Sequence, residues 1–448
     1  MPKSGPAAFA GGLESPIAEK GYETTRERPQ WNCLVDLLPA GSETAAVFNV
    51  MKATLGAGIL SLPFTMLSAG LALGLILLTV MAGLSVLSVG LIVRVVHKSG
   101  RDTYEEVVDL LFGRGWGFLY QLAMFVFCFG TSAVYIVTIY DIVSPVTIHA
   151  FGKDPEVWYA IVLTNRMYFS VLITVIVLLP VSLMKTINSI RYLTLTGSLC
   201  ACFLAITSLY VVIRYGAATT FTSDMLWKPL NVSSLVSAFN TYLFAFANQP
   251  NIPEIFTELS TPTPRTMRKV TLISIFSVLL LYAVEGCPFL VAYGTNTKSN
   301  ILISLGDRLN EGDLVVAVAF LMTAVTVVSS FPLNIYPVRI TILHSLRPER
   351  NKTVIGMVVS TLTVGLALCV AIILPDVNII LGVVGAMAGS VICFLTPAAL
   401  NMKLDRGDVF VRDRIYYCFM ITIGLVAFLM GTCIAILDAL KFYRQRTL

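Results

Sequence analysis

Long apolar segments dominate this chain and restrict what it can fold into. Several run for roughly 18 residues or more with at most one formal charge, the length that an α-helix needs to cross the hydrocarbon core of a bilayer. Of the 448 residues, 56% are hydrophobic and only 13% are charged, whereas soluble domains carry about a quarter charged residues. The pattern predicts an all-α polytopic membrane protein. Its eleven expected transmembrane helices are 45–69, 71–96, 116–140, 167–186, 190–214, 233–256, 270–293, 314–340, 353–374, 377–400 and 416–438.

The loops between these segments predict the orientation of the chain. Lys and Arg concentrate in one set of alternate loops, as at Arg265, Arg268 and Lys269. Short cytoplasmic loops carry such an excess of positive charge. We therefore expect the polar residues 1–42 to form a disordered cytoplasmic tail, with no signal peptide, and residues 441–448 to form a short tail on the outer side.

Several functional classes are disfavoured by the sequence. The loop residues account for the net charge of +5, so no basic patch for nucleic acid needs to be invoked. The cysteines lie mostly inside apolar segments, where a thiol behaves as a small hydrophobe. No HExxH, nucleophile elbow or P-loop run occurs in the sequence, and such motifs would be expected of a metalloprotease, a hydrolase or an ATP-driven pump. We expect neither an enzyme nor a cofactor or metal site.

Two of the expected helices contain helix-breaking residues. In 45–69, Gly56, Ala57 and Gly58 precede Pro63, and in 233–256 the break is expected near Asn248-Gln249-Pro250. Non-helical backbone at membrane depth is tolerated where it is buried in protein or lines a cavity. Such breaks therefore predict the position of a site, although Gly and Pro are also common in transmembrane helices generally.

The spacing of the two breaks indicates an internal repeat. Five helices separate one broken helix from the next, and an odd-numbered repeat inserts its second copy upside down. Inverted repeats with broken helices at corresponding positions point to a secondary transporter with its site near the bilayer midplane. We expect a transporter domain over 43–440, with one repeat at 43–215, a second at 232–402 and an accessory helix at 415–438. The segment 103–113 is expected to be an amphipathic interfacial helix.

Four motifs resemble the amino acid/auxin permease family, which includes sodium-coupled and proton-coupled amino acid transporters. They are LGAGILSLP at 55–63, QPNIPEIFTEL at 249–259, AYG with NIL within 292–302, and FPLNIYPVR at 331–339. The resemblance spans most of 45–440 and implies the five-plus-five inverted repeat of the bacterial leucine transporter. The sequence departs from the family at Phe289-Leu290, where Gly-Tyr is usual, and at Gln249, where a histidine is common.

The break residues are the expected substrate site. An amino acid in a dry site needs partners for its carboxylate and its ammonium. We expect the amides of Gly56, Ala57 and Gly58 to meet the carboxylate, and the carbonyls of Phe246 and Ala247 to meet the ammonium. The side chains of Phe246, Asn248 and Gln249 are candidates for reading the substrate side chain, with packing as the alternative, and Tyr135 is a candidate to close the pocket.

Four more residues are candidates for coupling. Lys52 places an ammonium one turn before a break, which marks a functional site by default. The family resemblance implies that Lys52 stands where sodium-coupled members carry an asparagine, so a fixed ammonium could replace sodium or exchange a proton; a purely structural strut is the alternative. Ser329 and Ser330 would be hydroxyl ligands of a sodium site. Glu285 is a candidate proton carrier, or a residue facing water near the outer mouth.

These residues predict a secondary transporter for a small amino acid, driven by protons or independent of sodium, working by alternating access. Sodium-coupled uptake of neutral amino acids is the alternative within the class. An amino-acid sensor that signals through a cytoplasmic partner is the alternative of another class, and an ion channel is a third. The partners expected are the amino acid and the lipid bilayer. The plasma membrane is preferred over a vacuolar or lysosomal membrane on frequency alone.

Overall fold

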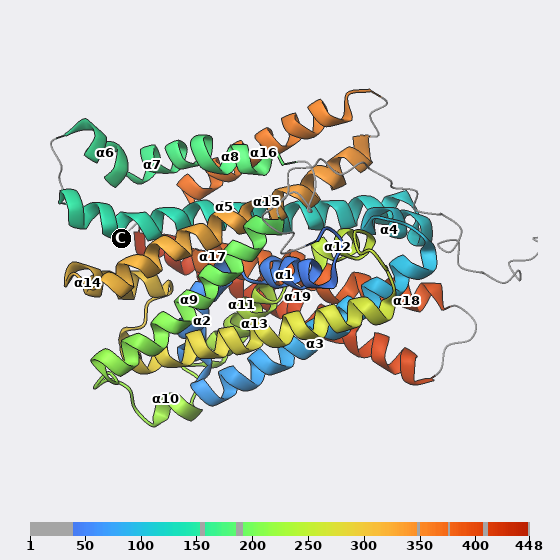
Figure 1. The fold of residues 1–448 in the computed structure, drawn as a ribbon. Helices are drawn as coiled ribbons and strands as arrows, with labels where there is room; N and C mark the ends of the chain where they lie inside the picture. Colours follow the sequence, from blue (N-terminus) through green and yellow to red (C-terminus); the bar gives the residue numbers. More distant parts are fainter. Residues whose placement is uncertain are drawn as a thin grey trace, which may run out of the picture.

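The computed structural model describes residues 39–152, 157–184, 191–346, 350–374, 377–405 and 411–446, which form an all-helical bundle (Figure 1). The expected tail at 1–42 lies almost entirely outside them. Over the described residues, eight helices are long and apolar enough to cross a membrane, or up to ten if each of two bent pairs is one span. The protein is therefore an integral membrane protein of the expected class.

Most of the long helices lie where the apolar segments predict them. Most of their ends lie within a few residues of the expected bounds. Several of the helices continue past the end of the expected apolar segment. These helices are α3 Leu71–Ser99, α5 Arg114–Phe151, α9 Arg191–Tyr215, α13 Pro264–Tyr293, α15 Leu314–Leu346, α16 Lys352–Ile373 and α19 Val411–Arg446.

The first expected helix is broken, as the sequence predicts. It comprises α1 Glu43–Thr54, the 3₁₀ turn η2 Ala57–Ser61 and α2 Leu62–Ala69, bent by 46°. The side chain of Ser42 caps the start of α1, and the backbone at Gly56 is extended. The interruption therefore falls within the Gly-Ala-Gly run.

The sixth expected helix is also broken. It comprises α11 Val232–Ala245, the 3₁₀ turn η5 Gln249–Asn251 and the short α12 Ile252–Thr257. A proline fixes its own φ angle and lacks an N–H donor, and Pro250 and Pro253 fall in the two turns that follow the break. Local sequence therefore sets both interruptions.

Two other segments are less regular than the sequence predicts. The segment expected at 167–186 is α7 Arg166–Ile173, a π-turn and α8 Leu179–Ser182, and a further helix, α6 Trp158–Thr164, meets it at a bend of 86°. Asn165 stands at this bend, where its side chain accepts from the Met167 and Tyr168 amides at 3.0 and 3.4 Å. The tenth expected helix contains two successive π-turns, η7 Gly385–Gly389 and η8 Val391–Leu395, between α17 Val377–Val384 and α18 Thr396–Leu404.

Besides the two halves of the sixth helix, three further short helices of the described residues lie outside the candidate spans. The amphipathic segment forms α4 Tyr104–Phe112, whose N-cap is Thr103, so the expected helix is present. Two more helices, α10 Asp224–Trp227 and α14 Ile301–Asn310, are not predicted by the sequence pattern. Helix α14 packs against α5 and contacts η2.

The core of the bundle forms around the broken helices. Helix α1 packs against α9 and α13, and α15 packs against both α5 and α9. Helix α19 lies against α11, α17 and α18 and is the least buried of the candidate spans. This packing places the breaks deep inside the bundle, away from lipid.

Candidate functional site

Lys52 lies in the last turn of α1 and is completely buried. Its ammonium donates to the carbonyl of Leu55 at 3.0 Å, three residues further along the chain and beyond the end of the helix. Among the residues that the structure describes, no carboxylate pairs with the Lys52 ammonium. A buried charge without a counter-ion is costly, so this position is unusual and points to function.

The space around the Lys52 side chain depends on Gly197 of α9. A Cβ atom at Gly197 would lie 1.9 Å from the Ser329 hydroxyl oxygen and 2.7 Å from the Lys52 Cε atom. Glycine at this position therefore lets α9, the lysine stem and α15 meet. The sequence gives no sign of this role for Gly197, because the role depends on which helices pack together.

The two serines of α15 lie at the same place. The Ser330 hydroxyl lies 3.1 Å from the Leu55 carbonyl oxygen, the acceptor that Lys52 also uses, and 3.0 Å from the Thr326 carbonyl. The Ser329 hydroxyl donates to the Thr326 carbonyl at 2.8 Å. The structure therefore brings Lys52, Ser329 and Ser330 together at the first break.

The second break is tied to the first by Asn248. Its amide nitrogen donates to the Thr54 hydroxyl at 3.0 Å, while its carbonyl oxygen Oδ1 is buried without a hydrogen-bond partner in the structure. A buried acceptor left unpaired costs about 1–3 kcal/mol. Asn248 Oδ1 is therefore well suited to accept a hydrogen bond from a ligand.

Tyr282 of α13 connects both unwound segments. Its hydroxyl lies 2.8 Å from the Thr54 carbonyl and 2.9 Å from the Ala245 carbonyl, so its single proton can be donated to either acceptor. Its ring packs edge-on against Phe246, with the ring centroids 5.3 Å apart. Tyr282 is not among the candidates predicted from the sequence, because nothing in its local sequence indicates that it reaches two breaks.

Gly56 and Gly58 allow close contacts on either side of the first break. A Cβ atom at Gly56 would lie 2.3 Å from the Tyr135 hydroxyl oxygen, and one at Gly58 would lie 3.2 Å from the Ala245 Cα atom. Tyr135 thus occupies the space over the Gly-Ala-Gly run.

Other predicted site residues are turned elsewhere or already bonded. The Gln249 side-chain oxygen accepts from the Cys393 thiol at 3.1 Å, on the side of η8. The Phe246 carbonyl accepts from the Ser85 hydroxyl at 3.1 Å and from the backbone amide of Asn248 at 3.1 Å. The Ala247 backbone amide donates to the Phe244 carbonyl at 3.1 Å.

Glu285 lies in the interior of α13 and is completely buried, which corrects the alternative in which it faces water at the outer mouth. Neither of its carboxyl oxygens has a hydrogen-bond partner in the structure. The neighbouring Gly286 lies close to Met66 of α2, since a Cβ atom there would be 2.7 Å from the methionine sulfur. Glu285 therefore faces the protein core.

Together, these residues define a broken-helix site in which two unwound segments meet between α9, α13 and α15. A family model described as transmembrane amino acid transporter protein matches residues 40–437. The chain belongs to this family of transmembrane amino acid transporters, and so it is a transporter and not an enzyme.

Several known proteins are similar to this chain. The chain is 26% identical over 400 residues to a putative sodium-coupled neutral amino acid transporter 11 from Bos taurus, covering 88% of this chain and 83% of that protein. It is 26% identical over 389 residues to the sodium-coupled neutral amino acid symporter 2 from Danio rerio, covering 81% and 75%. The crystal structure of MhsT in complex with L-phenylalanine superposes with a TM-score of 0.58 at 13% identity, covering 88% of this chain and 99% of that one. This match confirms the expected fold.

Proposed function

We propose that this protein is a secondary active transporter that moves a neutral amino acid by alternating access, driven by protons or independent of sodium. The observation that carries the proposal is the buried Lys52 ammonium, 3.0 Å from the Leu55 carbonyl at the first break. The carbonyls and hydroxyls of a helix break can coordinate a cation, and Lys52 supplies a covalently attached one. A fixed positive charge would do electrostatically what a bound sodium ion does.

The substrate would bind where the two breaks meet. Its carboxylate would face the amides of Gly56, Ala57 and Gly58 once Tyr135 moves aside, because half-helix N-termini attract negative charge. Its ammonium would be met by Asn248 Oδ1 and by the Ala247 carbonyl, because the Phe246 carbonyl already accepts from the Ser85 hydroxyl and the Asn248 backbone amide. The small side chains at the first break favour small or medium amino acids.

We infer that the N-terminus is cytoplasmic and that the conformation described is closed on that side. The Gly41 carbonyl accepts from the Ser260 amide and hydroxyl, both at 2.9 Å, and Glu43 pairs with Lys269 at 2.7 Å. These contacts connect the start of α1 to the loop that follows α12, through Ser260, and to α13, through Lys269. Opening toward the cytoplasm would break them.

Sodium-coupled symport is the second candidate. It is supported by the similarity to sodium-coupled neutral amino acid transporters and by the two hydroxyls of Ser329 and Ser330 beside the first break. The Ser330 hydroxyl shares the Leu55 carbonyl with Lys52, so a sodium ion would have to coexist with the ammonium or displace it. That geometry makes sodium coupling the weaker of the two proposals.

The test is uptake of a panel of labelled amino acids into proteoliposomes under an inward proton gradient, under an inward sodium gradient, or with neither gradient. In the control for the sodium gradient, choline replaces sodium. The proposal expects uptake of a neutral amino acid that is unaffected by replacing sodium with choline. Uptake that requires sodium would instead establish the symporter. Binding without any flux would overturn both and favour the sensor.

A further inference from the structure

One helix passes both sides of the second break. It consists of α17, the π-turns η7 and η8, and α18, and is called helix 10 below. Its first part, α17 with η7, packs against α11, which precedes the break, and η8 contacts η5, which follows it. Helix 10 therefore contacts both parts of the interrupted sixth helix.

The contact before the break is close because two residues of η7 are glycines. A Cβ atom at Gly385 would lie 2.8 Å from the Asn240 carbonyl oxygen, and one at Gly389 would lie 2.6 Å from the Leu243 side chain. Asn240 and Leu243 belong to the last two turns of α11. The backbone of helix 10 thus lies directly on the end of α11.

The contact after the break is a hydrogen bond between two side chains. The Cys393 thiol of η8 donates to the side-chain oxygen of Gln249 in η5 at 3.1 Å. Gln249 is 1% exposed and Cys393 is 2% exposed, so water does not replace either partner. Separating such a pair leaves a buried polar group unpaired, which is costly. Gln249 and Cys393 therefore move together.

Helix α3 binds the same two segments. The Ser85 hydroxyl donates to the Phe246 carbonyl at 3.1 Å, and the Ser88 hydroxyl donates to the Cys393 carbonyl. Residues three apart lie on one face of a helix. One face of α3 therefore holds the second break and η8 beside each other, which supports the contact between Gln249 and Cys393.

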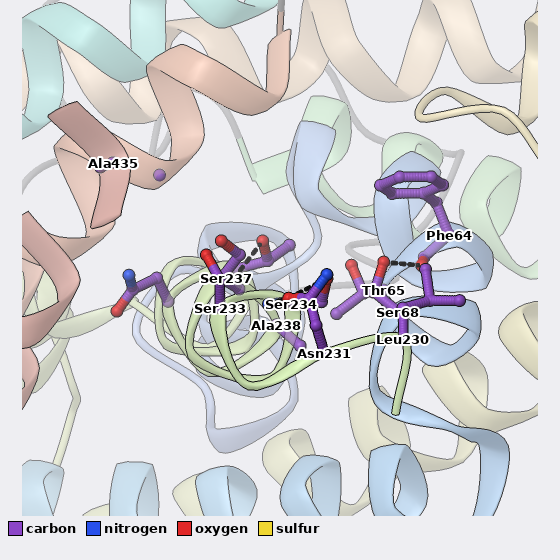
Figure 2. Close-up of a pocket in the computed structure, with 13 residues that line it drawn as sticks. Phe64, Thr65, Ser68, Leu230, Asn231, Ser233, Ser234, Ser237, Ala238 and Ala435 are labelled. Atoms are coloured by element: carbon purple, nitrogen blue, oxygen red, sulfur yellow. Dashed lines mark hydrogen bonds between the residues drawn. The ribbon is translucent and has the colours of Figure 1, made fainter. Parts of the chain in front are cut away.

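On the other side of η7, helix 10 is packed less tightly. A pocket of about 290 Å³ lies beside Gly382 of α17, between α2, α11 and α19. Figure 2 shows the serines of α11 and Ala435 of α19 on either side of this pocket. The two π-turns lie between the pocket and the hydrogen bond to Gln249. Because helices bend at π-turns, helix 10 has both a place to bend and space beside its first part.

We propose that Gln249 is a positioning residue that transmits movement of the second break through Cys393 to helix 10. Movement of η5 during the transport cycle carries Cys393 with it, and helix 10 bends at its π-turns as α17 moves into the free space beside it. Gln249 therefore acts on transport without touching the amino acid. The inference rests on the proposed function, since it requires alternating access, and it holds for either coupling ion.

The test is a double-mutant cycle in the full-length protein, with the neutral amino acid that the wild type takes up best. Gln249→Met keeps the length of the side chain and removes the acceptor, and Cys393→Val removes the donor. Each variant is expected to lower the maximal rate of uptake into proteoliposomes about three- to tenfold, and to leave the dissociation constant of the purified protein within about twofold of the wild type. The double variant should be no slower than the slower single variant, because the two side chains act through each other.

Two further variants serve as controls. Cys393→Ser keeps a donor and should retain the wild-type rate. Cys369→Val makes the same substitution as Cys393→Val at an exposed cysteine of α16, and it should change neither rate nor affinity. Effects of the two single variants that multiply in the double variant would overturn the proposal. A loss of affinity or a changed amino acid preference in Gln249→Met would also overturn it, because Gln249 would then contact the amino acid.

Hydrogen–deuterium exchange follows helix 10 itself. Addition of the amino acid should change the exchange of residues 384–396 in the wild type and leave it unchanged in Gln249→Met. A purely structural role of the pair would lower the melting temperature but leave the same exchange response in both proteins, and that result would overturn the proposal. Absence of uptake by wild-type proteoliposomes would instead show that the proposed function fails, and the inference with it.

Discussion

The Lys52 ammonium and the Ser330 hydroxyl share a single acceptor, the carbonyl oxygen of Leu55, at 3.0 and 3.1 Å. This acceptor lies immediately beyond the end of α1, where the helix has no further residue to satisfy it. One charged side chain from α1 and one hydroxyl from α15 therefore stabilise the unwound segment from two sides. Any movement of α1 relative to α15 has to change this arrangement.

Gly197→Ala is expected to disrupt this arrangement without touching a charge. The added methyl group would lie 1.9 Å from the Ser329 oxygen, and overpacking of a core costs about 1–3 kcal/mol. Uptake should fall and the thermal stability of the purified protein should decrease. Gly365→Ala is the matched control, because no atom lies within 4 Å of a Cβ there. Equal uptake and equal thermal stability of the two variants would show that the neighbours of Gly197 move aside at little energetic cost.

Tyr282→Phe is expected to loosen the connection between the two breaks. Loss of a hydrogen bond costs about 0.5–1.5 kcal/mol, and the buried Thr54 and Ala245 carbonyls would lose a donor that they share. Substrate affinity should fall more than the amount of folded protein, as measured by equilibrium binding alongside a melting curve. Tyr168→Phe, at an exposed tyrosine, should change neither. A Tyr282→Phe variant with wild-type affinity would exclude the hydroxyl from organising the site.

Glu285→Gln tests the carboxyl group in the interior of α13. Glutamine keeps the shape and removes the exchangeable acidic proton, and the two oxygens of Glu285 have no partner in the structure to lose. If Glu285 carries a proton, the variant should fold with wild-type stability and lose the stimulation of uptake by an inward proton gradient. Stimulation that persists would leave Lys52 as the coupling residue.

Glu105 of α4, outside the candidate spans, gives a stability prediction. Burial raises the pKa of its carboxyl group from the ordinary value of 4.5, against the effect of the Thr341 hydroxyl, which donates to it at 2.5 Å. A group with a raised folded pKa stabilises the protein below its unfolded pKa and loses that contribution as the pH rises through the folded value. Melting temperatures measured from pH 5 to pH 8 should therefore fall less in Glu105→Gln than in the wild type. Parallel profiles would contradict this.

The sequence predicts the two breaks well because their causes are local. Gly56 to Gly58 and the prolines at 250 and 253 interrupt a helix wherever they stand in an apolar segment. The functional candidate Lys52 was found for a similar reason, since a charge inside such a segment is conspicuous. These features need no knowledge of neighbouring helices.

The parts that could not be predicted depend on packing between distant segments. Gly197 is important only because α9 meets α1 and α15 at that point, and Tyr282 only because α13 passes both breaks. The bend at Asn165 depends on a side chain that caps the next helix. Gln249 has a side-chain amide that could bind a substrate, yet its position in the bundle places the amide oxygen against the Cys393 thiol.

The most direct test of the account is uptake by Lys52→Asn in proteoliposomes, compared with the wild type under a proton gradient, a sodium gradient or neither. The variant removes the fixed cation and supplies a neutral amide in its place. If the Lys52 ammonium replaces sodium, uptake by the wild type is indifferent to sodium, and the variant loses proton-stimulated uptake or becomes dependent on sodium. Sodium-dependent uptake by the wild type, or an unchanged ion response in Lys52→Asn, would contradict it.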